Sequence, residues 1–283
     1  MTNEQTVRQV KETLVKAGST FCAAKYRAYR EAIARENDEN ARWTLETLVE
    51  NAEAAERLQC PLCDDTGIPH LFLEIGRDRS LSGAMLENIY EGVRQGLEVL
   101  PGRPMAIGGE PWARIDQSGG ILPDPSDVEP APLLVRYVDG GLLRLHILMF
   151  GGGPAIRAKT YRVFHKHDAA VVKDEIVSWA VEATGKLGCT PATLAVGIGR
   201  SHYEAAALML ESLVYGDYDH PTPEEAEITR RVNEAKIGPL GLGGDATVLG
   251  TFLRIGPQRS SGVRIVCLRP CCCMEPRIAS LDL

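Results

Sequence analysis

Eight cysteines are the feature that most restricts how this chain of 283 residues can fold. They are Cys22, Cys60, Cys63, Cys189, Cys267, Cys271, Cys272 and Cys273. The N-terminal residues lack the basic, apolar and small segments of a signal peptide, so we expect a cytoplasmic location. Because cytosolic thiols are kept reduced, this many cysteines favours a metal or redox site over disulfide bonds.

Length and charge narrow the classes of protein further. A chain of this length forms either one large domain or two closely joined ones. It contains no run of about 18 apolar residues, so we expect no membrane span. Its net charge of -7 would repel phosphate backbones, which makes nucleic acid an unexpected partner.

Helical and strand-like segments occur along the whole chain, so we expect an α+β fold of mixed helices and small sheets. Helical spacing covers 7–58, 81–100 and 169–183, and Ser80 or Ser82 is expected to start the second of these helices. Capping boxes of Ser201 with Glu204 and of Thr222 with Glu225 predict two more helices, the first of which runs through Tyr215. Strand patterns cover 71–75, 133–138, 142–149, 248–255 and 263–268. Residues 101–132 are rich in proline and glycine. We therefore expect residues 1–283 to form one domain, or two lobes joined near 101–132.

Cys60 and Cys63 form a C-x-x-C pair in a segment whose proline, aspartates and glycine predict a turn. Such a pair alone fits a redox dithiol, half of a zinc site or ligands of an iron-sulfur cluster. A structural zinc site needs a second pair at similar spacing, which Cys189 and the C-terminal run do not offer in a standard form. Three cysteines from three distant loops would suit a cubane cluster whose fourth iron stays open for substrate.

Four motifs, in order along the chain, resemble those of class I fumarases and tartrate dehydratases. The first is Cys63 with Asp-Thr-Gly after one intervening residue, at 63–67. The others are the segments at 187–213, 237–250 and 269–280, which read LGCTPATLAVGIGRSHYEAAALMLESL, IGPLGLGGDATVLG and RPCCCMEPRIAS. The resemblance spans most of the chain and implies the cluster-binding domain of an iron-sulfur hydro-lyase.

By this resemblance, Cys63 and Cys189 are two ligands of an oxygen-labile 4Fe-4S cluster with an open fourth iron. The third ligand is Cys273, because an arginine, Arg277, follows it four residues on. Cys272 has the better offset from the preceding proline, so the choice between these two neighbours stays open. Adjacent side chains in extended backbone point to opposite faces, so only one of the run is expected to bind.

The resemblance also implies a reaction, the reversible dehydration of a small 2-hydroxy dicarboxylate of the fumarate/malate or tartrate type. Asp65 is expected to hold the substrate or metal-bound water, and Arg200 and Arg277 to pair with carboxylates. In the family the catalytic base comes from a second domain or a separate smaller subunit. We therefore expect a beta subunit as partner, in a homodimer or heterotetramer.

Two alternatives remain open at this stage. The polar Asn-Thr-Gly-Asp-Asn stretch that is usual in the family is missing between Arg103 and Pro132, which favours a non-catalytic iron-sulfur or metal-binding scaffold or a redox sensor. The second is a zinc-stabilised structural module. Cys22 and Cys267 are expected to be buried core residues, because free cysteine usually behaves as a small hydrophobe.

Overall fold

The computed structural model describes residues 2–283, and its contacts divide the chain into two compact units. Unit 1 comprises residues 1–21, 52–151 and 277–283, and unit 2 comprises residues 22–51 and 152–276. The chain passes between the units within α3 at Asn51 and Ala52, and also after Phe21, Gly151 and Pro276. The segment 101–132 lies wholly within unit 1.

Helices and two small sheets together confirm the α+β class. The helices are α1 (Asn3–Ser19), α2 (Ala23–Arg35), α3 (Glu39–Leu58), α4 (Gly83–Val99), α5 (Pro111–Asp116), α6 (Gly152–Ala155), α7 (Ala169–Leu187), α8 (His202–Tyr215) and α9 (Pro223–Asn233). Short 3-10 turns lie at Pro125–Asp127 and Pro239–Gly241. The strands are β1 (Ile68–Gly76), β2 (Leu134–Val138), β3 (Leu143–Phe150), β4 (Lys159–Phe164), β5 (Ala192–Gly199), β6 (Val248–Ile255), β7 (Val263–Cys271) and β8 (Ile278–Asp282).

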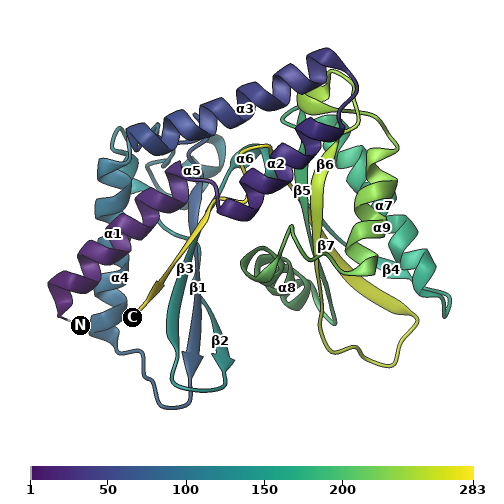
Figure 1. The fold of residues 1–283 in the computed structure, drawn as a ribbon. Coiled ribbons are helices and arrows are strands. Elements are labelled where there is room, and N and C mark those ends of the chain that lie inside the picture. Colours follow the sequence, from purple (N-terminus) through teal and green to yellow (C-terminus); the bar gives the residue numbers. More distant parts are fainter. Residues whose placement is uncertain (1) are drawn as a thin grey trace. The chain divides into compact units, whose positions relative to one another are not determined.

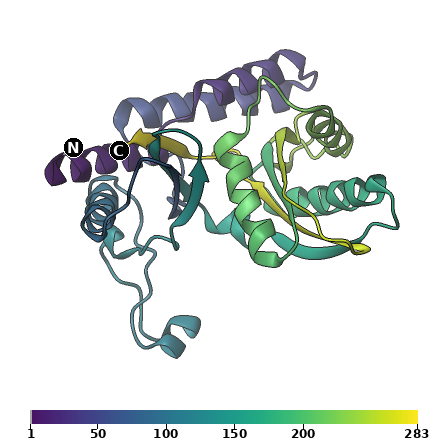
Figure 2. The same ribbon diagram turned by 90° about the horizontal axis from the view of Figure 1, so that it is seen from below.

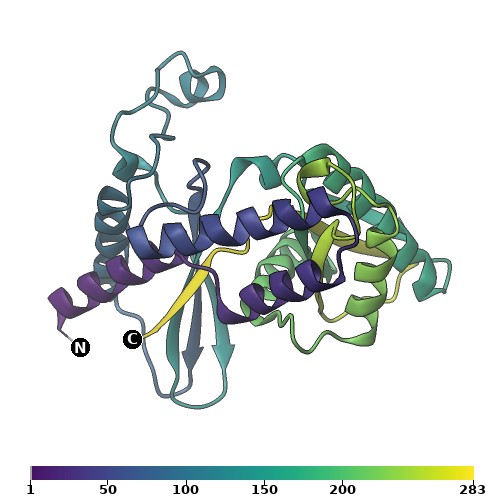
Figure 3. The same cartoon turned by 45° about the horizontal axis from the view of Figure 1, so that its top comes forward.

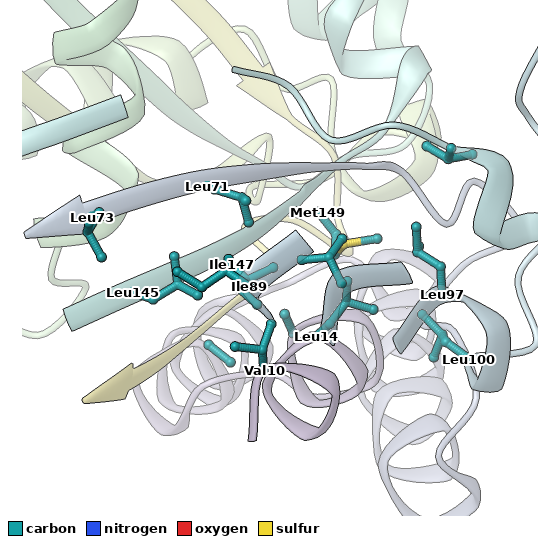
Figure 4. Close-up of a cluster of buried hydrophobic side chains, with 14 of the residues drawn as sticks. Val10, Leu14, Leu71, Leu73, Ile89, Leu97, Leu100, Leu145, Ile147 and Met149 are labelled. Carbon is teal, nitrogen blue, oxygen red and sulfur yellow. The ribbon is translucent and has the colours of Figure 1, made fainter. Parts of the chain in front are cut away.

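Unit 1 is a four-stranded sheet with α1 and α4 packed on one face (Figure 1). The strand order is β2-β1-β3-β8, in which β1 pairs parallel with β2 and β3 pairs antiparallel with β1 and β8. Alternate residues of the strands face the helices, as the period of two requires. Figure 4 shows the resulting core, in which Val10 and Leu14 of α1 and Ile89 of α4 meet Leu145 and Ile147 of β3.

Unit 2 contains the second sheet, of order β4-β7-β5-β6. Its central strands β7 and β5 are antiparallel, and β5 and β6 are parallel. In Figure 1, α8 lies on one face of this sheet and α7 and α9 lie on the other. Gly197 allows α8 to approach β5 closely, because a Cβ there would lie 2.1 Å from the Ala205 carbonyl oxygen. Buried Leu194 and Val196 belong to the same strand, whose eight residues are all buried.

The proline-rich segment of unit 1 forms an ordered excursion that carries α5. In Figure 2 this segment extends away from the sheet and helices of unit 1, and Figure 3 shows it from a second direction. An isolated bridge between Ile107 and Ile121 closes its base, with a hydrogen bond from the Gly108 amide to the Gly120 carbonyl oxygen at 2.9 Å. Trp112 at its tip is 81% exposed.

Most predicted elements are confirmed with boundaries shifted by a few residues. Ser82 caps α4, and Thr222 with Glu225 forms the capping box of α9. Ser201 caps α8, but the Glu204 carboxylate binds Arg200 instead of completing a box. The sequence patterns missed three strands, β4, β5 and β8.

The buried-core prediction is confirmed for Cys267 but is wrong for Cys22. Cys267 is 3% exposed on β7. Cys22 is exposed because it occupies the N-cap position before α2, outside the helix. Among the described residues, no helix is long and apolar enough to cross a membrane.

Candidate functional site

In unit 2, Cys189 lies in the short connection between α7 and β5. Gly188 ends α7 in the left-handed conformation, at φ 75°, which glycine adopts at low cost. The chain then passes through Cys189 and Thr190 into the buried strand β5, which begins at Ala192. The Cys189 residue is exposed. The end of a helix and the start of a strand therefore place this cysteine at the surface.

The cysteine run lies at the end of β7, beside Cys189. The amide of Cys273 donates a hydrogen bond of 2.7 Å to the Cys189 carbonyl oxygen, so two of the sequence motifs meet within unit 2. Cys272 and Cys273 are 9% and 6% exposed. The hydrogen bond with Cys272 and burial hold the pKa of Cys273 well above its usual range. Burial likewise raises the pKa of Cys271 to about 12.

The chain turns at 272–275, directly after β7, where the Glu275 amide donates to the Cys272 carbonyl oxygen. Two side chains of α2 hold the backbone of this turn. The Lys25 ammonium donates to the Glu275 carbonyl oxygen at 2.6 Å, and the Tyr29 hydroxyl donates to the Cys273 carbonyl oxygen at 2.8 Å. Both side chains are fully buried, at 0% exposure. Burial lowers the pKa of Lys25 to about 8, while the neighbouring thiols oppose that shift. Lys25 is therefore still mainly an ammonium at pH 7.

A buried ion pair between the side chains of Arg269 and Glu275 also holds this turn. Arg269 of β7 binds the Glu275 carboxylate through both terminal nitrogens, and Arg269 also donates to the Cys271 sulfur at 3.2 Å. The Arg269 and Glu275 side chains are 3% and 1% exposed. Such a pair adds little net stability, because the cost of desolvating both charges offsets their attraction.

The glycine-rich segment 237–247 closes around the residue after Cys189. The Thr190 hydroxyl donates to the Gly238 carbonyl oxygen at 2.5 Å and accepts from the Gly241 amide at 3.1 Å. Gly238 has φ 69°, and a Cβ there would lie 1.6 Å from the Gly243 carbonyl oxygen, so only glycine fits. The glycines of this motif therefore serve tight backbone packing beside Cys189, as their composition predicts.

In unit 1, Cys63 lies in the predicted loop between α3 and β1. The Leu62 amide donates to the Gly18 carbonyl oxygen at 3.0 Å, which ties the loop to the end of α1. The Cys63 thiol donates to an Asp64 carboxylate oxygen at 3.3 Å, and this contact lowers the pKa of Asp64. Asp64 is 84% exposed and lies 3.8 Å from Arg103.

Asp65 and Arg277 are in contact within unit 1. Arg277 is 2% exposed and donates to the Asp65 carbonyl oxygen at 2.7 Å. Two glycines make room for them. A Cβ on Gly151 would lie 2.7 Å from an Asp65 carboxylate oxygen, and one on Gly67, at φ +90°, would lie 2.8 Å from an Arg277 nitrogen.

Arg200 is placed apart from the cysteines of unit 2. It follows the C-terminal end of β5, whereas Cys189 precedes its N-terminal end. Seven steps of about 3.3 Å separate the two ends of an eight-residue strand, or about 23 Å. The Arg200 guanidinium also binds the Glu204 carboxylate at 2.7 Å. The structure therefore does not bring Arg200 together with Cys189 or the cysteine run.

The donor chemistry of unit 2 fits an iron-sulfur cluster. All eight cysteines are thiols rather than disulfides, and the backbone contact between Cys189 and Cys273 brings two thiol-bearing motifs together. Thiolates are the usual ligands of such clusters. Within residues 2–283, no three His, Cys, Asp or Glu side chains form a preformed metal-binding group. Cys63, the remaining predicted ligand, belongs to unit 1.

The residues that support the site were not among the predicted site residues. Lys25 and Tyr29 lie four positions apart, which places them on one face of a helix, and a lysine on a buried face is an unusual signal. Neither residue belongs to the four motifs. Gly151 lies in a run of three glycines, which indicates a tight turn. The sequence does not reveal that the Asp65 and Arg277 side chains lie against this glycine.

Comparison with known proteins agrees with the family resemblance of the four sequence motifs. Residues 7–281 match the family described as fumarate hydratase (Fumerase). A Methanocaldococcus jannaschii protein provisionally named L(+)-tartrate dehydratase subunit alpha is 29% identical over 254 residues, which cover 86% of each chain. The L(+)-tartrate dehydratase subunit alpha of Escherichia coli K12 is 26% identical over 247 residues, covering 80% of this chain and 74% of the relative. Because the family match spans nearly the whole sequence, this chain belongs to the fumarate hydratase family and is a hydro-lyase enzyme.

Proposed function

We propose that this chain is the cluster-bearing alpha subunit of a 4Fe-4S hydro-lyase that dehydrates a small 2-hydroxy dicarboxylate. The hydrogen bond between the Cys273 amide and the Cys189 carbonyl oxygen carries the proposal, because it joins two motifs that are distant in sequence. The ligands are Cys63, Cys189 and one of the neighbours Cys272 and Cys273. L-Tartrate is the first substrate to assay, since both compared relatives bear its name.

When bound, a cluster with one open iron supplies a Lewis acid that makes the substrate hydroxyl a better leaving group. Asp65 orients the hydroxyl or the departing water. Arg277 keeps Asp65 in place through the bond to its carbonyl oxygen and lends positive charge where a substrate carboxylate binds.

The remaining step is the removal of a proton. A base takes it from the carbon next to the hydroxyl-bearing carbon, the electrons of that C–H bond form the C=C bond, and the hydroxyl leaves with the electrons of its C–O bond. We assign the base to a separate beta subunit, because the relatives are named as alpha subunits. Arg200 has no part in this proposal, because it lies at the far end of β5 from Cys189.

A scaffold or redox-sensing protein without turnover is the second candidate. Its support is in the sequence, because the polar Asn-Thr-Gly-Asp-Asn stretch that is usual in the family is missing between Arg103 and Pro132. Such a protein would bind the cluster but show no dehydration of tartrate, malate or citramalate with its beta subunit.

The first test is anaerobic reconstitution with iron and sulfide. We expect about four irons per chain and a brown visible spectrum. Cys189→Ser should lose most of the colour and iron, whereas Cys60→Ser and the exposed Cys22→Ser should retain both. Comparing Cys272→Ser with Cys273→Ser identifies the third ligand. A colourless wild-type protein that contains zinc would reject the cluster.

A further inference from the structure

Lys25 and Tyr29 form a latch from α2 onto the turn that carries the cysteine run. They lie four residues apart and so project from the same face of the helix. Their polar atoms reach two carbonyl oxygens of the turn, those of Glu275 at 2.6 Å and Cys273 at 2.8 Å. The turn is thus held from α2 at two points on its backbone.

Other contacts fix the same turn from its remaining sides. The Cys273 amide binds the Cys189 carbonyl oxygen at 2.7 Å, and the Glu275 amide binds the Cys272 carbonyl oxygen at 2.8 Å. Arg269 holds the Glu275 carboxylate. Together with the latch, these contacts bind the carbonyl oxygens of Cys272, Cys273 and Glu275 and the amides of Cys273 and Glu275.

Packing alone does not account for a lysine at this position. Lys25 is 0% exposed, and a buried ammonium pays a desolvation penalty that a methionine of similar length would avoid. Its ammonium group donates to the Glu275 carbonyl oxygen, two residues beyond Cys273. A methionine could not make this hydrogen bond, so a lysine here suits a role in holding the turn.

We propose that Lys25 and Tyr29 are positioning residues that hold the Cys272–Cys273 turn in the geometry for cluster binding. This inference rests on the proposed cluster function. Each residue acts through one hydrogen bond to a backbone carbonyl oxygen of the turn. Each substitution therefore removes one of the two points of attachment.

The latch is tested first in the protein without a cluster. Tyr29→Phe and Lys25→Met are compared with the wild type and with Arg30→Met, which removes an exposed charge from the same helix. The rate of alkylation is measured at each cysteine by mass spectrometry of peptides, at one pH. We expect Cys272 and Cys273 to react about tenfold faster in both latch variants, because a buried carbonyl left without its donor opens the turn. Cys60 in unit 1 is the reference thiol.

The outcomes separate positioning from charge. If Lys25 acted by charge alone, its loss would slow alkylation by disfavouring the thiolate, and Tyr29→Phe would change nothing. That pattern overturns the latch. If Lys25→Met does not fold, Tyr29→Phe decides the positioning role, with thermal denaturation showing that the variant is folded.

A second measurement uses the reconstituted protein. We expect less iron per chain in both latch variants, because a turn that has opened no longer holds the thiol ligands in place. An unchanged iron content in both variants would overturn the inference while leaving the proposed function intact. Failure of the wild type to bind iron would reject the proposed function, and the alkylation result would still decide the latch.

Discussion

Gly151 makes room for two side chains of the candidate site. A Cβ at this position would lie 2.7 Å from an Asp65 carboxylate oxygen and 3.2 Å from an Arg277 nitrogen. Both contacts are with the ends of side chains, which can move at small cost. The same is not true of Gly67, where a Cβ would lie 2.8 Å from the carbonyl carbon of Phe150.

We therefore expect Gly151→Ala to impair catalysis more than stability. The added methyl group should displace the Asp65 carboxylate, lowering kcat at least about tenfold when the beta subunit is present, since a misplacement of about 1 Å can cost a hundredfold. The free energy of unfolding should change by less than about 1 kcal/mol. Steady-state kinetics, iron content and urea denaturation check these results.

Gly153→Ala is the matched control, because no atom lies within 4 Å of its Cβ position. It should retain wild-type kinetics. Equal kcat in the wild type and Gly151→Ala, with iron contents the same, would remove Asp65 from the proposed mechanism.

At the scale of elements, β5 is the strand that organises unit 2. Cys189 precedes it, Arg200 follows it, and it pairs with both β6 and β7. Pairing with β7 brings the cysteine run to the Cys189 end of the strand, where Thr193 is opposite Cys271. The strand thus joins two cysteine motifs and separates both from Arg200.

Because α8 packs closely on β5, we predict that a side chain at position 197 destabilises the protein. A Cβ on Gly197 would lie 2.1 Å from the Ala205 carbonyl oxygen and 2.3 Å from the Met209 amide nitrogen, and both belong to backbone that cannot move alone. Gly197→Ala should lower the free energy of unfolding by about 1–3 kcal/mol, the range for an overpacked core. Urea denaturation followed by circular dichroism measures it.

Gly185→Ala in α7 is the comparison, since the nearest atom to its Cβ position is a side-chain carbon 3.8 Å away. Replacing a glycine inside a helix should stabilise the protein by about 0.5–1 kcal/mol. A Gly197→Ala variant as stable as the wild type would show that α8 can shift away from β5.

At the scale of the whole molecule, the candidate residues divide between the two units. Cys63, Asp65 and Arg277 belong to unit 1, and Cys189 and the cysteine run belong to unit 2. No catalytic base has been assigned to this chain. The compared relatives are named as alpha subunits, and the proposed function assigns the base to a separate beta subunit.

We therefore expect the reconstituted chain alone to hold iron yet to show less than about one hundredth of the dehydration rate seen with its beta subunit, since general acid-base catalysis contributes about 10²–10⁴-fold. Anaerobic assays of tartrate, malate and citramalate, with and without the beta subunit, measure this. Full turnover by the chain alone would place the base within these 283 residues. Exposure to air should abolish activity in parallel with iron loss.

The sequence by itself determined the family, the α+β class and most elements with strong local signals. Ser82 and the Thr222–Glu225 box are examples, because capping depends on residues only three positions apart. Its motifs also identified Cys63, Cys189 and the cysteine run as candidate ligands, because residue type and order can be read from the sequence without any geometry. Their binding role stays a prediction.

Only the tertiary structure decided which of these residues are neighbours. The meeting of Cys189 with Cys273 depends on strand pairing between β5 and β7, and β5 was not recognised because its eight residues are buried on both faces and lack alternation. The distance of Arg200 from Cys189 depends on the length of β5 in this sheet. The contacts of Lys25 and Tyr29 depend on the position of α2 beside the turn that follows β7. Long-range pairing is set by the whole folded core, so no local pattern could have revealed these contacts.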